Sequence, residues 1–417
     1  MPVTESPAAA LPAWLQAAIA PPAPASRRVR LTVEAVDGAR VRIADETLVN
    51  FAGNDYLGLA ADPAVRAAAI AGALRWGVGG TASHLLSGHT RAHQKTEERA
   101  AAWLGFERAL LFSSGYLANL AVVTALAGRG ASLYADRLNH ACLNDAARLS
   151  GARLRRYRHA DLDTLARWLA ADPAAQKWVL TDAVFSMDGD IARIDRLLDL
   201  CRRWDAMLLV DDAHGFGVLG DGRGTLHEPA FAARVLNAGR ADPRVVLMVT
   251  LGKAAGAAGA LLLGAATLVE AIVQRGRSYI YTTALPPLLA EAATAAIDRL
   301  ADDDCQRRRT GLLAAASDLR QSLADAGIAG RSGATGPLSG QAEGLPATPI
   351  VPVLLGSAAR ALAAAAALRC AGLWAPAIRP PTVPAGTARL RVSLSAGHSA
   401  PELDRLMHAL KEFFRNG

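Results

Sequence analysis

The sequence predicts an α/β protein with a mostly parallel central sheet and a smaller C-terminal α+β domain. Three apolar runs of strand length support this prediction, at residues 178–184, 207–210 and 245–249. None of the three runs alternates between polar and apolar residues. Such runs are typical of parallel strands that are covered by helices on both faces.

Each apolar run leads directly into polar residues. The polar segments are 185–190 (FSMDGD), 211–215 (DDAHG) and 250–253 (TLGK). Ligands of open α/β sheets bind at the carboxyl ends of the strands, so we expect these segments to meet at one edge of the sheet. Carboxylates, an imidazole, hydroxyls and the amine of Lys253 would then surround one small ligand.

The size and composition indicate a multidomain globular protein. The chain has 417 residues, of which 52% are hydrophobic and 20% charged, which is enough for a sizeable core. We predict an N-terminal arm over residues 1–50, a large α/β domain over 51–285 and the small domain over 286–417. The net charge of +7 permits an anionic substrate. Charges of both signs are interspersed and the densest basic run, 153–158 (RLRRYR), suits a solvated face, which argues against nucleic-acid binding.

The cysteines and the N-terminus indicate a cytoplasmic protein. The four cysteines lie far apart and show no metal-ligand spacing, so reduced thiols and no metal site are expected. They are Cys142, Cys201, Cys305 and Cys370. The N-terminus has an early Glu5 and prolines among its alanines, which does not fit a signal peptide, and no uncharged apolar stretch reaches membrane-spanning length.

The N-terminal part is expected to hold small elements and one candidate loop. Residues 12–19 predict a short helix, and 28–43 a hairpin around Asp37-Gly38. Residues 51–59 form a polar, glycine-bearing loop around Asn54, before a helix that opens at Asp62-Pro63. This loop lines a pocket or is a simple asparagine turn.

Three further segments are candidates for ligand binding. Residues 77–88 are rich in glycine and hydroxyls, as in a loop that approaches a ligand or in a flexible surface loop. Residues 113–119 predict a strand, a Ser-Gly turn and a helix start, an arrangement whose free amides bind phosphate, with a bare turn as the alternative. His140 follows another short strand, and a structural histidine is the alternative there.

The C-terminal part predicts a boundary and then alternating elements. Residues 277–287 predict a short strand that ends at a double proline, followed by a long helical pattern to about residue 326 and a loop over 330–344. Strands over 348–355 and 388–394 and helices over 357–371 and 400–414 complete the domain. Prolines after Arg379 would fix this arginine for a carboxylate, and a structural arginine is the alternative.

Together these residues predict pyridoxal 5'-phosphate (PLP) chemistry. Lys253 would form a Schiff base, with desolvation lowering its pKa. Asp211 would pair with the pyridine nitrogen and so make the ring an electron sink. His214 would bond the phenolic oxygen and His140 would stack on the ring. The phosphate would lie at the helix start, with Thr250 assisting; that start comprises Ser114, Gly115 and Tyr116.

From about residue 50 to its end the chain resembles the α-oxoamine synthases, PLP enzymes of fold type I, which is the aspartate aminotransferase-like fold. The matching motifs are residues 54–58 (NDYLG), 114–115 (SG), 139–141 (NHA), 185–190 (FSMDGD), 211–215 (DDAHG), 250–253 (TLGK) and 378–391 (IRPPTVPAGTARLR). The last motif is similar to members that condense L-alanine with pimeloyl-CoA or pimeloyl-carrier protein in biotin synthesis. Glycine-using relatives usually differ there.

The resemblance implies roles for individual residues. Lys253 would anchor the cofactor and also remove the α-proton of the amino acid, and Ser186 would frame the ring together with His140. Thr282 and Thr283 would reach a phosphate in the partner subunit of a homodimer. Binding of the amino acid and the acyl donor would fall to the remaining candidates, Asn54, Arg379, Thr382 and Arg28 of the arm.

Three segments depart from the family pattern, and two other functions compete. Residues 79–84 (GGTASH), 254–259 (AAGAAG) and the arm around Arg28 differ from the usual forms, which bears on substrate detail more than on reaction class. A sister reaction, glycine acetyltransfer or 5-aminolevulinate synthesis, is the nearest alternative. A non-catalytic fold type I subunit is the other, although such a subunit is expected to lose the lysine that is present here.

Overall fold

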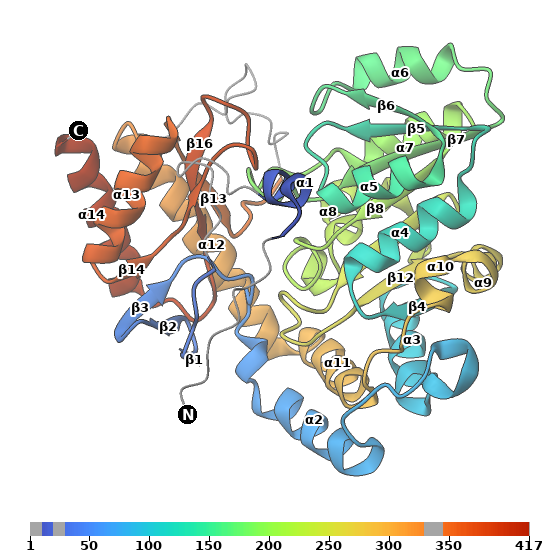
Figure 1. Ribbon diagram of the computed structural model, residues 1–417, viewed down its shortest axis with the longest axis horizontal. Coiled ribbons are helices and arrows are strands. Elements are labelled where there is room, and N and C mark those ends of the chain that lie inside the picture. The colour runs from blue at the N-terminus through green and yellow to red at the C-terminus, as the bar shows by residue number, and fades with distance from the viewer. Residues whose placement is uncertain (1–10, 20–29, 329–344, 417) are drawn as a thin grey trace.

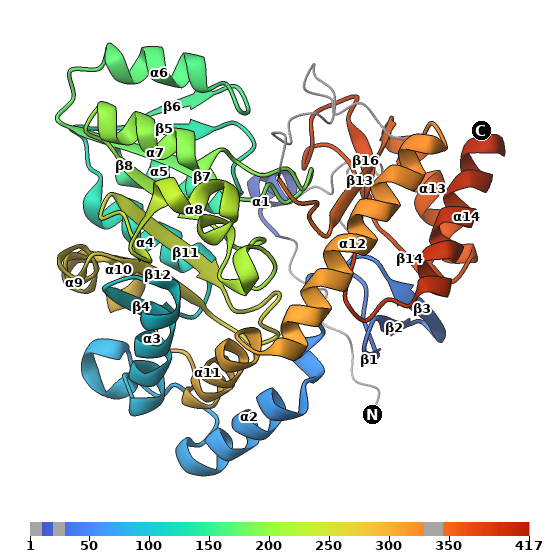
Figure 2. The same cartoon turned by 180° about the vertical axis from the view of Figure 1, so that it is seen from behind.

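A computed structural model describes residues 11–19, 30–328 and 345–416. Figure 1 shows a larger α/β part beside a smaller part, with the long helix α12 (Asp303–Asp325) running between them. The view from behind in Figure 2 shows the same division. The predicted fold class, α/β with a mostly parallel sheet and a smaller α+β part, is confirmed.

The larger part is built on a seven-stranded sheet. In spatial order its strands are β4 (Arg108–Phe112), β12 (Ala260–Gly264), β11 (Val245–Thr250), β8 (Met207–Asp211), β7 (Gln176–Asp182), β5 (Ala131–Asp136) and β6 (Arg153–Tyr157). Strand β12 runs antiparallel to both of its neighbours, and the other adjacent pairs are parallel. The three apolar runs of the sequence are the adjacent strands β7, β8 and β11, so their carboxyl ends meet.

Helices cover both faces of this sheet, which explains why its strands do not alternate in polarity. In β11, Val245, Leu247 and Val249 pack into one core, whereas Val246 and Met248 pack into a second core on the other face. The second core is closed by α4 (Gly115–Leu126), α5 (Ala141–Ser150), α9 (Ala266–Arg275) and α10 (Arg277–Ile280). The first core is closed by α3 (Arg91–Leu104), α6 (Leu162–Ala170), α7 (Ile194–Arg203) and α8 (Pro229–Val235).

The strand predicted over 277–287 is wrong, because residues Arg277–Ile280 form the short helix α10. Aromatic and β-branched residues in this stretch favour a strand locally, but tertiary contacts decide otherwise. Tyr279 is buried against Phe112, and the Ser278 hydroxyl donates a hydrogen bond to the Leu117 carbonyl at 2.7 Å. Within this stretch, Thr283 enters an isolated β-bridge with Ser83.

The N-terminal residues pair with the C-terminal part. Helix α1 (Ala13–Ala18) matches the predicted helix, and β1 (Ala35–Asp37) and β2 (Arg40–Ile43) form the predicted hairpin. Strand β3 (Glu46–Asn50) extends the hairpin and pairs in parallel with β14 (Leu373–Trp374), far along the chain. Helix α2 (Pro63–Trp76) then opens as expected, with the Asp62 side chain accepting from the first free amides.

The C-terminal part contains a three-stranded antiparallel sheet in the order β13 (Ile350–Gly356), β16 (Ala388–Ser393) and β15 (Ala377–Ile378). Helices α13 (Ala358–Cys370) and α14 (Ala400–Asn416) accompany it. The predicted continuous helical pattern divides into α11 (Pro287–Leu300) and α12, because Asp302 caps the second helix through the Cys305 amide. The loop predicted over 330–344 lies outside the described residues, and the domain boundaries stay a prediction.

Smaller elements fill the connections. Strands β9 (Leu236–Asn237) and β10 (Arg240–Ala241) form a short hairpin, and a π-helix spans His84–Gly88. The 3-10 helices are Leu59–Ala61, Gly220–Gly222 and Thr225–His227. Within the described ranges, no helix is both long and apolar enough to cross a membrane.

Candidate active site

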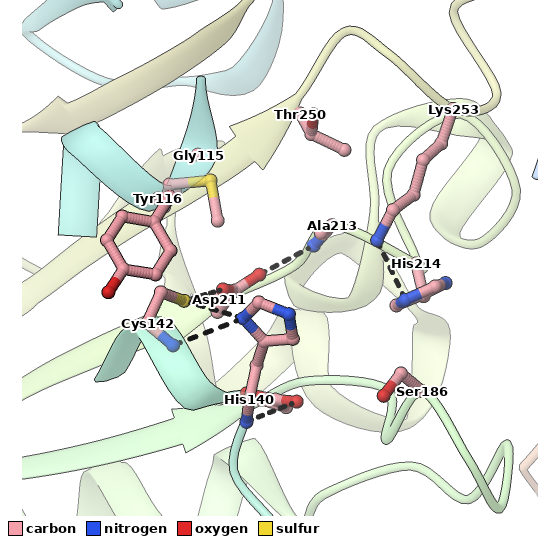
Figure 3. Close-up of a pocket in the computed structure, with 12 residues that line it drawn as sticks. Gly115, Tyr116, His140, Cys142, Ser186, Asp211, Ala213, His214, Thr250 and Lys253 are labelled. Carbon is pink, nitrogen blue, oxygen red and sulfur yellow. Dashed lines mark hydrogen bonds between the residues drawn. The ribbon is translucent and has the colours of Figure 1, made fainter. Parts of the chain in front are cut away.

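A cavity of ≈190 Å³ opens at the carboxyl ends of β5, β7, β8 and β11 (Figure 3). It lies at the sheet edge where the sequence predicts that polar segments converge. The residues that line it are Gly115, Tyr116, His140, Cys142, Asp182, Ser186, Asp211, Ala213, His214, Met248, Thr250 and Lys253. The three strand-end segments therefore supply side chains to one cavity.

Lys253 reaches this cavity from the turn that follows β11. The turn is closed by backbone hydrogen bonds from Gly256 to the Lys253 carbonyl at 2.8 Å and from Leu251 to the Gly259 carbonyl at 2.9 Å. The Lys253 Nζ lies 2.7 Å from Nε2 of His214. Burial lowers the pKa of Lys253 to about 8, with the positive charge of Arg391 adding to the effect and Asp211 opposing it. An appreciable fraction of the amine is therefore unprotonated, and nucleophilic, near neutral pH.

Asp211 ends β8, lines the cavity and is 6% exposed. Its carboxylate accepts from Nδ2 of Asn119 at 2.8 Å and from the Ala213 amide at 3.1 Å. These donors come from α4 and from the turn after β8, on two sides of the carboxylate. They orient it and stabilise its negative charge, as a partner for a protonated ring nitrogen requires.

Asp182 is a second buried carboxylate, at the end of the neighbouring strand β7. Burial, together with the nearby Asp211, raises the pKa of Asp182 well above its usual range. Both of its oxygens accept from the backbone amide of His140, at 3.1 and 3.2 Å. Asp182 therefore fixes the backbone of His140. The Asp211 carboxylate is instead fixed by the Asn119 side chain and the Ala213 amide.

A chain of hydrogen bonds runs from Lys253 to an arginine of the C-terminal sheet. Nδ1 of His214 lies 2.7 Å from the Tyr56 hydroxyl, which is 3.1 Å from Oδ1 of Asn54. Burial lowers the pKa of His214 well below its usual range and raises that of Tyr56 to about 12, so both groups are neutral. The contacts are satisfied when Nδ1 of His214 carries the proton and Nε2 accepts from the lysine amine.

The far end of this chain is Arg391, which is 7% exposed in β16. Its Nη2 donates to Oδ1 of Asn54 at 3.2 Å, and its Nε donates to the Ser186 carbonyl. Its positive charge lowers the pKa of both Lys253 and His214. The guanidinium therefore provides a cation within electrostatic reach of the cavity.

The start of α4 lies across the cavity from Lys253 and is a candidate anion site (Figure 3). The Ser114 side chain caps the helix by accepting from the Leu117 amide at 3.3 Å, and the first amides of a helix have no acceptor within the helix. At Gly115 a Cβ would lie 3.0 Å from the Met248 side chain, so glycine lets the helix start pack closely against β11. Tyr116 and Thr250 line the same side of the cavity.

His140 precedes α5, and its side chain stands in the open cavity. Its Nδ1 lies 2.9 Å from Sγ of Cys142 and accepts from the Cys142 amide at 3.3 Å. Burial and the charge of Asp211 raise the pKa of the Cys142 thiol, so Cys142 stays protonated. One face of the imidazole is thus available for stacking.

These features fit PLP. A nucleophilic amine, a buried oriented carboxylate, a helix start for a phosphate and an aromatic face occur together, and each is placed by a different strand end. In the described part of the chain, no group of three or more His, Cys, Asp or Glu residues is arranged to hold a metal ion.

Not every predicted site residue lines the cavity. Ser114 acts as a helix cap, and Thr283 pairs with Ser83 in a β-bridge. Thr382 is exposed and donates its amide to the Arg379 carbonyl at 3.0 Å, while Arg379 itself is half-buried after β15. Thr282 is half-buried beside Thr283, and Arg28 lies outside the described residues. The roles proposed for these residues stay predictions.

Sequence reasoning did not single out several residues that shape the cavity. They are Tyr56, Asn119, Cys142, Asp182 and Arg391. A signal existed for Asp182, because a carboxylate inside an otherwise apolar buried strand needs a partner. It also existed for Arg391, one of two arginines that alternate with apolar residues in β16 and are both buried.

The fold and cavity define a PLP-dependent enzyme of fold type I, and the family model for aminotransferases of class I and II matches residues 46–410. The 8-amino-7-oxononanoate synthase of Nitrosomonas europaea is 50% identical over 386 residues, 92% of this chain and 94% of that protein. The same enzyme of Herminiimonas arsenicoxydans is 48% identical over 387 residues, 92% and 95% of the two chains.

Two solved structures of related enzymes have the same fold as this chain. Serine palmitoyltransferase of S. paucimobilis with bound PLP–myriocin superimposes with a TM-score of 0.83 at 28% identity, covering 93% of this chain and 92% of that one. The 8-amino-7-oxononanoate synthase of Francisella tularensis gives 0.72 at 27% identity, with 88% and 98% covered. The chain belongs to the α-oxoamine synthase family of PLP-dependent acyltransferases, among which the relatives that share about half its residues are 8-amino-7-oxononanoate synthases.

Proposed function

We propose that the protein condenses L-alanine with a pimeloyl thioester and releases 8-amino-7-oxononanoate, carbon dioxide and the free thiol. A bond forms between the α-carbon of alanine and the thioester carbonyl carbon, the thiolate leaves, and the alanine carboxylate departs as carbon dioxide. The observation that carries the proposal is the cavity, in which the Lys253 amine lies within electrostatic reach of an oriented carboxylate, Asp211, and a buried arginine, Arg391. The names of relatives that are 48–50% identical over most of their length supply the substrates.

PLP, when bound, supplies an aldehyde that reacts with primary amines and a ring that withdraws electrons from the α-carbon of the amino acid. Asp211 would hold the ring nitrogen in its protonated form. The amides at the start of α4 would bind the phosphate, with Thr250 nearby. His140 would cover one ring face, and Ser186 would border the ring from the loop after β7.

Lys253 would move the proton at the α-carbon. Its pKa of about 8 lets it accept that proton near neutral pH and return one to the product carbon. His214 holds the amine through Nε2 while remaining neutral, so it orients the lysine without adding a competing positive charge.

Arg391 is the better candidate for the alanine carboxylate, and Arg379 the better candidate for the acyl donor. Arg391 is fixed by Asn54, Ser393 and the Ser186 carbonyl, and its charge acts on Lys253. Arg379 sits after β15 in a segment with the exposed Thr382, and neither arginine is among the residues that line the cavity. A carboxylate bound by Arg391 would place the α-carbon close to the amine that deprotonates it.

The protein would act as a homodimer. Large apolar side chains are exposed at the end of α2, in the π-helix and after α10, which follow one another along one flank of the molecule in Figure 1. They are Ile70, Leu74, Val78, Leu86 and Tyr281, exposed by 61–86%. Thr282 and Thr283 follow Tyr281 on this flank, which supports the expectation from the resemblance that they reach a phosphate in the partner subunit.

The dimer proposal is tested by the mass of the protein in solution. The double substitution Leu74→Glu and Leu86→Glu should give a monomer with weaker PLP binding. Leu362→Glu on α13, where leucine is 42% exposed, is the matched control and should leave the dimer intact. A wild-type protein that is monomeric at micromolar concentration would contradict the proposal.

The acyl donor would be pimeloyl-CoA or the pimeloyl group on a carrier protein. The protein would act in the cytoplasm, a reducing compartment that suits its four unpaired cysteines. The test measures free-thiol release by the PLP-loaded protein from both pimeloyl donors, with L-alanine, glycine and L-serine in parallel and the product mass read alongside. We expect release with alanine and a product of the mass of 8-amino-7-oxononanoate. Release with glycine alone would reject the alanine assignment in favour of a sister reaction. No release with any pair would reject the proposed reaction.

A further inference from the structure

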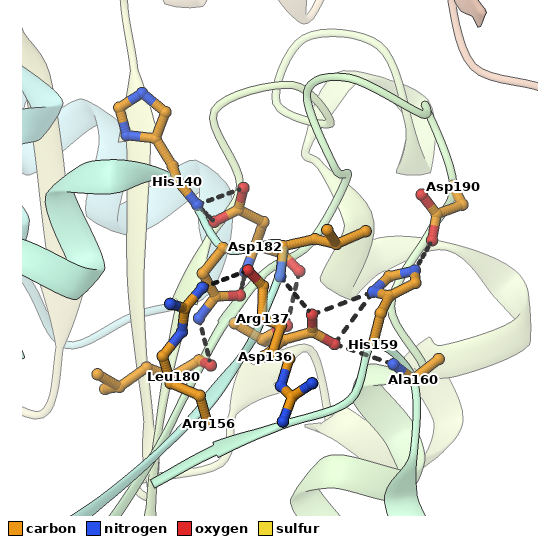
Figure 4. Close-up of polar contacts among 12 residues, drawn as sticks. Asp136, Arg137, His140, Arg156, His159, Ala160, Leu180, Asp182 and Asp190 are labelled. Atoms are coloured by element: carbon orange, nitrogen blue, oxygen red, sulfur yellow. Dashed lines mark hydrogen bonds and ion pairs between the residues drawn. The ribbon is translucent and has the colours of Figure 1, made fainter. Parts of the chain in front are cut away.

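A half-buried histidine outside the cavity joins two of the loops that form it (Figure 4). His159 lies just after β6, and its side chain is 17% exposed. Its Nδ1 is 3.1 Å from both carboxylate oxygens of Asp136, and its Nε2 is 2.7 Å from Oδ2 of Asp190. The imidazole therefore spans two carboxylates, one on each loop.

The Asp136 end controls the turn that presents His140. Asp136 ends β5, and its carboxylate also accepts from the amides of Leu138 at 2.8 Å and Ala160 at 3.0 Å. Its carbonyl accepts from the Asn139 amide at 3.2 Å, and the Asn139 side chain in turn bonds the backbone of β7. The position of the His140 backbone thus depends on the carboxylate that His159 holds.

The Asp190 end controls the loop that carries Ser186. The Asp190 carbonyl accepts from the Phe185 amide at 3.0 Å, which closes residues 185–190 into a compact loop. His159 also meets the Phe185 ring edge-on, with ring centroids 4.5 Å apart. From the other side, Arg389 and Arg391 of the C-terminal sheet hold the same loop through Asp188 and the Ser186 carbonyl.

Only the doubly protonated imidazole satisfies both contacts. A neutral histidine donates from one nitrogen, which would leave one carboxylate facing a lone pair. Burial disfavours the charged ring, but the hydrogen bonds and charges of Asp136 and Asp190 outweigh it and raise the pKa of His159 to about 10. The positive charge of the nearby Arg320 also interacts with the negative charge of the Asp190 carboxylate.

We propose that His159 is a positioning residue that fixes the separation of His140 and Ser186 by clamping Asp136 to Asp190, and so sets the orientation of the PLP ring between them. The inference rests on the proposed use of this cavity for PLP. His159 itself is absent from the cavity wall, so its effect must pass through the two loops.

The test is His159→Gln, which keeps one donor but cannot span both carboxylates. The apoprotein is titrated with PLP, and the visible circular dichroism of the bound cofactor is recorded. We expect PLP affinity to fall about tenfold, as the loss of a charge-assisted hydrogen bond warrants, together with a reduced dichroic signal per bound PLP. In the alanine reaction kcat should fall while KM for alanine changes less than about twofold, because Arg391 keeps its contacts with Asn54 and Ser393, which lie outside the clamped loop.

If His159→Gln folds poorly, the single variant Asp190→Asn still tests the clamp, and where His159→Gln folds, a double variant tests the coupling of the two residues. Asp190→Asn removes one end of the clamp and should reduce the dichroic signal in the same direction. The double variant His159→Gln/Asp190→Asn should lose less than the sum of the two single losses, because both act on one contact. Additive losses would overturn the clamp.

Asp172→Asn is the matched structural control. Asp172 is a buried carboxylate that accepts from Tyr134 and Arg153 of β5 and β6 but touches neither cavity loop. It should lower the melting temperature and leave the dichroic signal unchanged. A His159→Gln protein that behaves like this control, with a lower melting temperature and normal PLP signals, would reduce His159 to a structural role. The PLP readouts need no substrate, so they remain decisive even if alanine and pimeloyl thioesters prove not to be the substrates.

Discussion

The floor and the wall of the cavity are built differently. The floor consists of residues at the ends of adjacent strands, where Asp211 and His140 are held by groups one strand or one helix away. By the wall we mean Asn54 and Arg391, which do not line the cavity themselves but hold each other and the backbone of the lining residue Ser186. They lie 337 positions apart in the sequence and meet only because the C-terminal sheet packs beside the larger part. The floor thus follows from the central sheet alone, whereas the wall depends on how the two parts are joined.

This difference separates two tasks. A cofactor common to a whole family needs a site that changes little, and the ends of parallel strands provide it. A substrate that differs among family members needs residues that can vary without disturbing that site. We therefore expect floor variants to affect cofactor chemistry and turnover, and wall variants to affect substrate binding.

Lys253→Ala gives the largest expected effect, because it removes the proposed anchor and the proposed base together. Turnover should fall by at least roughly 10³-fold while the circular dichroism of the backbone stays native. The measurement is thiol release with and without added methylamine. Turnover without the added amine would refute the assignment of Lys253.

Asp211→Asn should have the second-largest effect, a loss of about 10²- to 10³-fold in kcat. The substitution keeps the shape of the side chain but removes the negative charge proposed to face the ring nitrogen. Asp182→Asn is the matched control. The pKa of Asp182 is raised and its oxygens face a backbone amide, so neutralising it should cost less. Equal losses at the two positions would mean that the floor does not assign the ring nitrogen to Asp211.

A wall variant should behave differently. Arg391→Lys loses the planar guanidinium that bonds Asn54 and Ser393, so KM for alanine should rise about 10- to 100-fold with a smaller change in kcat. In Arg379→Ala, KM for the acyl donor should change instead. If Arg379→Ala raises KM for alanine more than Arg391→Lys does, the two arginines have been assigned in the wrong order.

The smallest expected effect is a shift in the pH dependence of PLP capture, caused by the charge of Arg391 acting on Lys253. Capture of PLP by the apoprotein, fixed by borohydride, requires the neutral amine of Lys253. Its rate should rise with pH and level off above the pKa of about 8, rather than continue toward the ordinary lysine value of 10.5. Arg391→Gln removes a charge that lowers this pKa, so the midpoint should move upward. An unchanged midpoint would show that burial alone sets the pKa of Lys253.

The floor can be predicted from the sequence because its signals are local. An apolar run followed by a polar tip indicates both a strand and its carboxyl end, which is enough to place Asp211, His214 and Lys253 on one edge of the sheet. Lys253 and the start of α4 also carry residue types that PLP chemistry requires. Asp182 escapes this reasoning because it sits within the apolar run itself.

The wall cannot be predicted in the same way. The burial of Arg391 depends on contacts with Asn54 and with the loop at Ser186, none of which is near in sequence. The wrong strand over 277–287 has the same origin, since long-range packing of Tyr279 overrides local preference. Thr282 and Thr283 depend on a second chain, which a single sequence does not specify.

The outermost strand of the central sheet bears on solubility. Among the described strands, β6 pairs with a neighbour on one side only, and an open strand edge invites other chains to add to it and aggregate. Three of its five residues are arginines, of which Arg153 pairs with Asp172, Arg155 lies over the Trp168 ring and Arg156 is exposed, so this edge carries net positive charge. The basic run that recognises no nucleic acid in our interpretation would thus disfavour the pairing of an identical molecule with this edge.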